Sequence, residues 1–201
     1  MLQQPLRWGI VGKPVTDRSF DPGVLRTRRL ALVPMSCVLM RAIMNKNWMS
    51  AQSVLGTPFP EEWHADGWGW LAPRAIDGEM FPPSLLWGTR MAHLLDADGD
   101  GRGPVIAEAG FHGPPGGGGW VEIGYRVVVG HRREGFAEEA ASGLIAWAIE
   151  QGVHGVRGSV SPRNVASSNL LRKLGFIETG SYRHRTLGEQ LSFSRTTKRV
   201  S

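Results

Sequence analysis

One segment in the second half of the chain constrains the fold more than any other. Residues 120–129, WVEIGYRVVV, begin with the apolar/polar alternation of a half-buried β-strand. Residues 135–152, GFAEEAASGLIAWAIEQG, place apolar side chains together on one face of a helix. Only the short turn GHRRE joins the two. A strand that runs directly into an amphipathic helix predicts a layered α/β fold, in which the helix covers a sheet.

The turn also concentrates positive charge at the start of the predicted helix. Arg132 and Arg133 precede Gly135, which is followed by Phe136 and Ala137. The first N–H groups of a helix have no partner within it, and the helix dipole favours an anion there. Because Gly135 lacks a Cβ, a ligand can approach the backbone closely. We therefore predict a phosphate or pyrophosphate site, with a tight turn and solvated arginines as the alternative.

The remaining segments extend the α/β pattern. Strand patterns precede and follow the strand, turn and helix over 120–152. Two further segments have helical periodicity, and a hairpin closes the chain. The predicted strands are 28–34, 85–95, 103–111, 120–129, 154–161, 176–185 and 190–197, and the helices are 36–45, 135–152 and 164–175, with loop and short helix over 54–70. We predict a mixed, mostly antiparallel central sheet of about seven strands with helices on both faces.

Length and composition favour one folded domain. The chain has 201 residues, of which 41% are hydrophobic, enough for a complete core. Residues 1–25 are rich in Pro and Gly without a period, so we predict a loosely packed or disordered extension before a domain over 26–201. The sequence lacks a long apolar run and a signal peptide, and Cys37, its single cysteine, lies in an apolar segment. These features predict a cytoplasmic protein without a membrane partner, and a core thiol at Cys37.

The net charge and two other motifs indicate what kind of ligand or partner the protein binds. The net charge of +5 fits an anionic partner, either nucleic acid or a phosphorylated cofactor. The run DADGDG at 96–101 begins like a calcium loop, but Ala107 stands where such a loop needs a glutamate, so we predict no metal. The cluster of Trp63, Trp68 and Trp70 with Trp87 could stack on bases or sugars. No nucleic-acid motif accompanies it, and we predict that it covers the open end of the core or lines the acceptor cleft.

Two motifs resemble those of the GNAT-type N-acetyltransferases. RxxGxA at 132–137 resembles their pyrophosphate loop, and NVASSNLLRKLGF at 164–176 resembles their last helix. This second motif and GFHGPPGGGGWVEIGY at 110–125 are similar to the branch of ribosomal-protein N-terminal acetyltransferases. The resemblance implies the acyl-CoA N-acyltransferase fold. It further implies acetyl-CoA as co-substrate and direct attack by a primary amine in a ternary complex. The acceptor is a protein N-terminus or a small amine, bound by the variable segment 36–84.

The resemblance also implies where acetyl-CoA binds. Its pantetheine arm is expected along the strand before the loop, and its pyrophosphate at the loop. The chain departs from the family at Val129, where proline is usual, and at RREGFAE, where RGRGYAT is common. Glu134 and Glu138 therefore bring negative charge to the predicted anion site. The expected cofactor-binding residues are Tyr125, Val127, Val129, Arg132, Arg133, Gly135, Phe136, Ala137, Asn164 and Ser167.

The catalytic groups are less clearly marked. Many members of the family have a tyrosine on the last helix as general acid, and this chain has Leu171 there. Ser167 stands in the place used by the ribosomal-protein branch, where a hydroxyl can bind the sulfur, although it could simply cap the helix. Glu122 alternates with its apolar neighbours and is our candidate base, with a solvent-facing glutamate as the alternative. Weaker candidates are Glu108, His112 and His64.

Two other classes of function remain open at this point. A catalytically silent CoA-binding or protein-interaction module would bind acetyl-CoA without turnover. A nucleic-acid-binding protein would lose affinity steeply as salt increases. We favour the acetyltransferase, with no nucleic-acid partner. A homodimer through a sheet edge or the N-terminal arm is compatible with the sequence.

Overall fold

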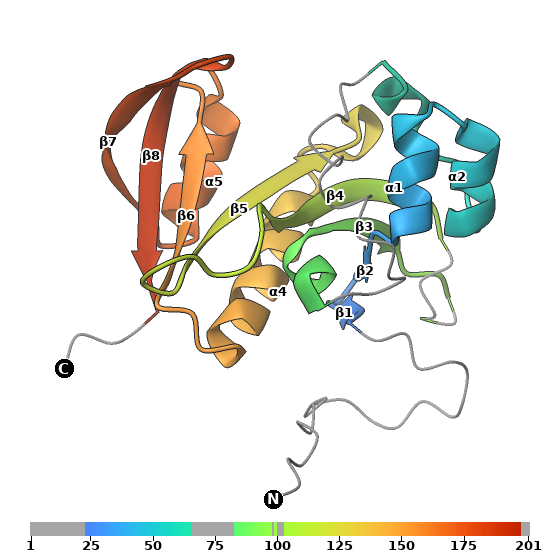
Figure 1. Cartoon of the computed structure of the whole chain (residues 1–201), viewed down its shortest axis with the longest axis horizontal. Coiled ribbons are helices and arrows are strands. Elements are labelled where there is room, and N and C mark those ends of the chain that lie inside the picture. Colours follow the sequence, from blue (N-terminus) through green and yellow to red (C-terminus); the bar gives the residue numbers. More distant parts are fainter. Residues whose placement is uncertain (1–22, 66–82, 98, 100–102, 198–201) are drawn as a thin grey trace, which may run out of the picture.

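The computed structural model describes residues 23–65, 83–97, 99 and 103–197. Its centre is an eight-stranded sheet in the order β1-β2-β3-β4-β5-β6-β8-β7, drawn in Figure 1. The strands are β1 (Leu25–Arg26), β2 (Leu30–Pro34), β3 (Thr89–Leu94), β4 (Val105–Phe111), β5 (Trp120–Val127), β6 (Gly155–Val160), β7 (Ile177–His184) and β8 (Gly188–Thr196). Only β5 and β6 pair in parallel, whereas the other neighbours are antiparallel. The predicted mixed, mostly antiparallel sheet is confirmed, and the additional strand is the two-residue β1.

Four α-helices accompany the sheet in the described part of the chain. They are α1 (Cys37–Met44), α2 (Trp48–Leu55), α4 (Phe136–Glu150) and α5 (Val165–Lys173), and short 3₁₀ turns are η1 (Glu61–Trp63), η3 (Pro83–Trp87) and η4 (Val129–His131). The sequence did not indicate α2, because only Ala51 of that helix is buried and its apolar period is weak. Two strand boundaries also need correction. The strand predicted over 85–95 begins at Thr89, after η3, and the strand predicted over 120–129 ends at Val127, before η4.

The helices cover both faces of the sheet. One core cluster joins Ala92 of β3 to α4 and α5, and a second joins the adjacent Met91 to α1. Because successive strand residues point to opposite faces, these two clusters lie on opposite sides of the sheet. Cys37 is buried in the α1 cluster with 1% exposure, which confirms the predicted core thiol.

The junction of β5 and β6 is the irregular part of the sheet. Their parallel pairing covers only Trp120 to Glu122 on β5, opposite Gly155 to Arg157 on β6. Beyond these residues β5 stays paired with β4, while β6 stays paired with β8. Figure 1 shows the two strands diverging toward their carboxyl ends. Main-chain groups on the facing edges of the separated strands are therefore left for another partner.

Some predictions fall outside the described residues. These are most of the N-terminal extension, Trp68 and Trp70, and half of the 96–101 turn. The described structure begins at Gly23, and β1 takes in Leu25, the last residue of the predicted extension. Within the described ranges, no helix combines the length and the apolar composition that crossing a bilayer requires.

Candidate active site

A cavity of about 180 Å³ opens where β5 and β6 separate. It is bounded by both strands, by the start of α5, and by one histidine that follows β4. An extended ligand that carries amide groups could bond there to the strand edges, as an added strand does. The lining residues are His112, Ile123, Gly124, Tyr125, Gly158, Ser159, Val160, Ser161, Asn164, Ser167 and Leu171.

The start of α5 places two polar side chains at this cavity. The Asn164 amide oxygen caps the helix by accepting a bond from the N–H of Ser167 at 3.1 Å. Since Asn164 is the cap, the hydroxyl of Ser167 is not needed for that purpose. Tyr125, on the opposite wall, donates its hydroxyl to the carbonyl oxygen of Ser167 at 3.5 Å. Burial raises the pKa of Tyr125, against a smaller lowering by Ser167, so Tyr125 stays protonated and able to donate.

The start of α4 differs from the starts of the other α-helices described. Side chains of Ser36, Asn47 and Asn164 cap α1, α2 and α5. The N-cap of α4 is Gly135, at φ 84°, and no side chain caps this helix. A side chain at this φ would be strained, so glycine suits the turn. The first N–H groups of α4 are therefore the natural place for an external anion.

Glu134 in the loop and Glu138 in the first turn of α4 both have basic neighbours. Lys173, at the end of α5, places its Nζ 2.6 Å from the carboxylate of Glu138. His131 lies 3.7 Å from the carboxylate of Glu134. Lys173 thus offsets the negative charge of Glu138 locally, a contact between distant residues that the sequence alone could not show.

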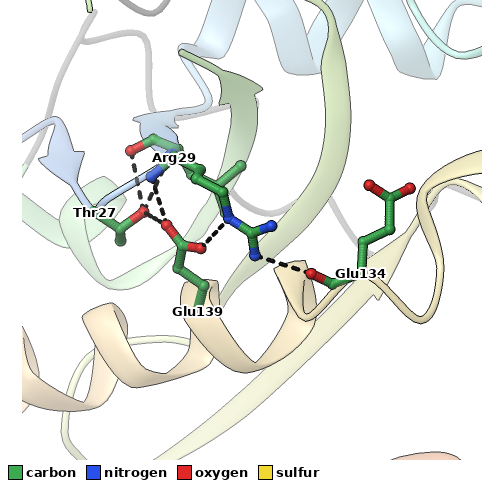
Figure 2. Close-up of polar contacts among 5 residues, drawn as sticks. Thr27, Arg29, Glu134 and Glu139 are labelled. Atoms are coloured by element: carbon green, nitrogen blue, oxygen red, sulfur yellow. Dashed lines mark hydrogen bonds and ion pairs between the residues drawn. The ribbon is translucent and has the colours of Figure 1, made fainter.

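A third glutamate ties the loop to the beginning of the domain, as Figure 2 shows. Glu139 accepts bonds from the hydroxyl of Thr27 at 2.7 Å and from the N–H and Nε of Arg29 at 2.6 and 2.7 Å. The other end of the Arg29 guanidinium donates to the carbonyl oxygen of Glu134 at 3.0 Å. It also lies 4.1 Å from the centre of the Phe136 ring. Arg29 therefore holds the turn against α4.

The two arginines of the loop occupy different environments. Arg132 donates its Nε to the carbonyl oxygen of Val127, the last residue of β5, at 3.1 Å. Arg133 is exposed and has a φ of 65°, a left-handed conformation that side chains disfavour. Arg133 stands at the position where the resembling loops have glycine. Its backbone has the conformation that glycine adopts most easily, so the turn is kept although the residue has changed.

Replacing Arg133 separates the effect of its charge from that of its backbone conformation. We expect Arg133→Gly to raise the free energy of unfolding by about 0.5–1 kcal/mol, because it relieves the left-handed strain. Arg133→Ala should bring no such gain, since alanine keeps the strain. Both variants should weaken acetyl-CoA binding equally, because both lose the charge. Urea unfolding and calorimetry measure the two quantities, and a gain in stability with alanine would contradict the interpretation of φ.

Val129 lies just beyond the strand in which we placed it. Its N–H donates to both carboxylate oxygens of Glu62 at 3.1 Å. A proline at this position would have no N–H to donate. The sequence did not predict this role of Glu62. The one signal was Val129 itself, because it supplies an N–H where the family usually has proline.

Among the candidate bases, two are placed away from the cavity. Glu108 pairs with Arg126 at 2.8 Å, and the Arg126 guanidinium also lies 4.4 Å from the centre of the Trp63 ring. His64 stacks on Trp48 at 4.3 Å and does not line the cavity.

The other histidine candidate, His112, is adjacent to Glu122. His112 lines the cavity, and its Nδ1 lies 3.7 Å from the Glu122 carboxylate. The imidazole of His112 is the largest cause that lowers the pKa of Glu122. Burial opposes this effect, while Ser159 and the charges of His112 and Arg157 add to it. Glu122 is therefore a carboxylate at neutral pH.

This geometry agrees with comparisons to known proteins. Residues 29–177 match the acetyltransferase (GNAT) domain family. The chain belongs to this family. A segment of 84 residues is 36% identical to the uncharacterized N-acetyltransferase YjdG of Bacillus subtilis, covering 40% of this chain and 50% of YjdG. The match thus spans about half of that relative.

Solved structures share the whole fold. An acetyltransferase from Agrobacterium tumefaciens is 25% identical, with a TM-score of 0.56, over 90% of this chain and 99% of that one. RimL, a ribosomal L7/L12 α-N-protein acetyltransferase in complex with coenzyme A, is 11% identical. Its TM-score is 0.58, over 86% of this chain and 97% of RimL. At that identity, RimL supports the fold alone.

Some of the residues predicted to bind the cofactor lie at the cavity or at the start of α4. Tyr125, Asn164 and Ser167 line the cavity, and Gly135 marks the uncapped start of α4. Phe136 is 4% exposed and packs in the core, so only its backbone is available to a ligand.

Proposed function

We propose that this member of the GNAT family is an acetyl-CoA-dependent acyltransferase, which moves the acetyl group of acetyl-CoA to a primary amine by direct attack in a ternary complex. The acceptor is a protein N-terminus or a small molecule. The observation that carries the proposal is the cavity between the separated ends of β5 and β6, together with the uncapped start of α4, the helix that follows β5. The two features suit a ligand with an amide-bearing arm at one end and a phosphate group at the other.

Acetyl-CoA would occupy the site through its two polar parts. The pyrophosphate would bind the N–H groups at the start of α4, with the charges of Arg132 and Arg133 nearby. The pantetheine amides would bond to the free edge of β5, beside Tyr125. The carbonyl oxygen of Val127 already accepts a bond from Arg132, so an amide that pairs there has to displace that guanidinium. Arg132 would then be released toward the phosphates.

The chemistry follows from this placement. A neutral amine attacks the thioester carbonyl carbon, the C–N bond forms, the amine loses a proton, and the C–S bond breaks. Backbone N–H groups of β5 can stabilise the developing oxyanion. The departing thiolate needs a proton, and the hydroxyls of Ser167 and Tyr125 stand in the cavity to donate one or to bind the sulfur. With Leu171 in place of the tyrosine found in many relatives, these hydroxyls take over its part.

The test is an assay for release of CoA thiol from acetyl-CoA, with a serine-initiated hexapeptide and spermidine as the two amines. Mass spectrometry of the amine identifies the acetylated product. Thermal shift with acetyl-CoA, CoA and ATP runs alongside, since a ligand of the folded state raises the midpoint. A rise with both CoA species and turnover of either amine support the proposal. A rise without turnover of either amine would favour a silent CoA-binding module.

Ser167→Ala should lower kcat more than it changes the KM for acetyl-CoA. We expect a fall in kcat of about tenfold, less than the full value of a general acid, because Tyr125 and water remain. Asn169→Ala is the matched control, since this exposed residue lies on the same helix and does not line the cavity. Steady-state kinetics decide the matter: a change confined to KM would make Ser167 a binding residue only.

A further inference from the structure

A second group at the cavity has the chemistry of a base. His112 follows the end of β4, and its main-chain N–H donates to the carbonyl oxygen of Glu122 at 2.9 Å. This bond extends the pairing of β4 with β5 by one step, so the two side chains are held as neighbours. The side chain of His112 is 63% exposed, and that of Glu122 is 37% exposed. The pair is therefore fixed by the backbone at the open side of the cavity.

The two nitrogens of the His112 ring face different surroundings. Nδ1 is turned to the Glu122 carboxylate, at 3.7 Å. Nε2 lies against Gly124, a residue that lines the cavity, so closely that a Cβ on Gly124 would come within 3.0 Å of it. A carboxylate beside Nδ1 favours the tautomer with the proton on Nδ1. Nε2 then carries the lone pair, on the side of the cavity.

Among the described residues, groups on β5 and β6 lie near the pair. Glu122 is the anion next to the ring, and Arg157 lies opposite Glu122 on β6, where its guanidinium stacks 4.8 Å from the centre of the Trp120 ring. Ser159 from β6 and Tyr125 from β5 contribute neutral hydroxyls to the cavity. Glu122 is therefore placed to orient the ring.

We propose that Nε2 of His112 is the general base for the acceptor amine, and that Glu122 is the positioning residue that orients the ring. This inference rests on the proposed function. His112 takes the proton that the amine nitrogen loses as its lone pair forms the C–N bond. The C–S electron pair leaves with sulfur, and the thiolate receives a proton from the hydroxyl side of the cavity. The proton on His112 then passes to water, which reaches the exposed ring, and water returns a proton to the hydroxyl that protonated the thiolate.

Kinetics with acetyl-CoA and whichever of the serine-initiated hexapeptide and spermidine is acetylated provide the first test. His112→Gln should lower kcat about 100-fold, leave the KM for acetyl-CoA unchanged, and remove the acid limb of the kcat/KM profile. Glu122→Gln should keep the limb, because His112 remains in place as the base. His154→Gln, an exposed histidine outside the cavity, is the control. A limb that survives His112→Gln and vanishes with Glu122→Gln would overturn the assignment in favour of Glu122.

NMR of the imidazole nitrogens tests the ring itself without turnover. We expect neutral His112 to be protonated at Nδ1, and Glu122→Gln to reduce the share of that tautomer. A neutral ring protonated at Nε2 would overturn the proposal even if the enzyme is active, because that nitrogen could not accept a proton. Wild-type protein that binds acetyl-CoA and acetylates neither amine would overturn both this inference and the proposed function. Wild-type turnover with an unaffected His112→Gln variant would overturn this inference alone.

Discussion

Gly135→Asp should abolish acetyl-CoA binding while leaving the fold in place. The new carboxylate would stand at the uncapped start of α4, where it would occupy the N–H groups and repel a phosphate. A Cβ at Gly135 would lie 3.5 Å from a guanidinium nitrogen of Arg29, so the carboxylate also gains a cationic neighbour. We expect affinity to fall by about 100-fold or more, equivalent to about 2.8 kcal/mol. Calorimetric titration with acetyl-CoA measures the loss.

Gly152→Asp is a closely matched control for this variant. Gly152 follows the other end of α4 and has a φ of 79°, against 84° at Gly135, so both substitutions carry similar backbone strain and the same charge. Both should lower the unfolding midpoint, and Gly152→Asp somewhat more, because a negative charge opposes the dipole at that end of the helix. Only Gly135→Asp should lose acetyl-CoA. Equal affinity in the two variants would remove the anion site from the start of α4.

The parts of this site that sequence could predict are local. The strand, turn and helix over 120–152 are contiguous, so alternation, glycine and helical period together locate the start of α4. The start of α5 is similar, because Asn164 is a typical cap residue and acts as one. The fold class followed from the order of such elements. Helix α2 and the turn η3 were missed because weak period and short length give no signal in a single sequence.

The parts that sequence could not predict depend on distant residues. Arg29 and Glu139 are separated by 110 positions, and Glu62 and Val129 by 67. No periodicity links such pairs, since they meet only when the sheet and helices are assembled. The same holds for Lys173 and Glu138, whose ion pair offsets a charge that the sequence shows as unfavourable. The orientation of His112 also needs the β4–β5 register, which places it against Glu122.

Glu139→Ala should destabilise the protein more than any other single change of a charged residue in the loop or in the first turn of α4. Three donors from Thr27 and Arg29 lose their acceptor, and the side chains of Arg29 and Glu139 are only 29% and 14% exposed. We expect the free energy of unfolding to fall by about 2–3 kcal/mol, because donors are left without a partner. Glu138→Ala is the control, since its more exposed pair with Lys173 should be worth about 0.5 kcal/mol or less. Urea unfolding of both variants measures the difference.

The pH dependence of the stability difference between wild type and Glu139→Gln tests whether the charge of Glu139 contributes to the same network. Burial raises the pKa of Glu139, but the bonds from Thr27 and Arg29, with the Arg29 charge, outweigh it and lower the pKa below the ordinary 4.5. A carboxyl whose pKa is lower in the folded state stabilises the fold above its unfolded pKa, and that stability is lost as the pH falls through the folded pKa. The stability gap between wild type and Glu139→Gln should therefore be full at pH 7 and shrink as the pH falls below 4.5. A gap that is constant over this range would mean that Glu139 contributes by shape and neutral bonding. In that case the charge on Arg29 would not be what holds the loop to α4.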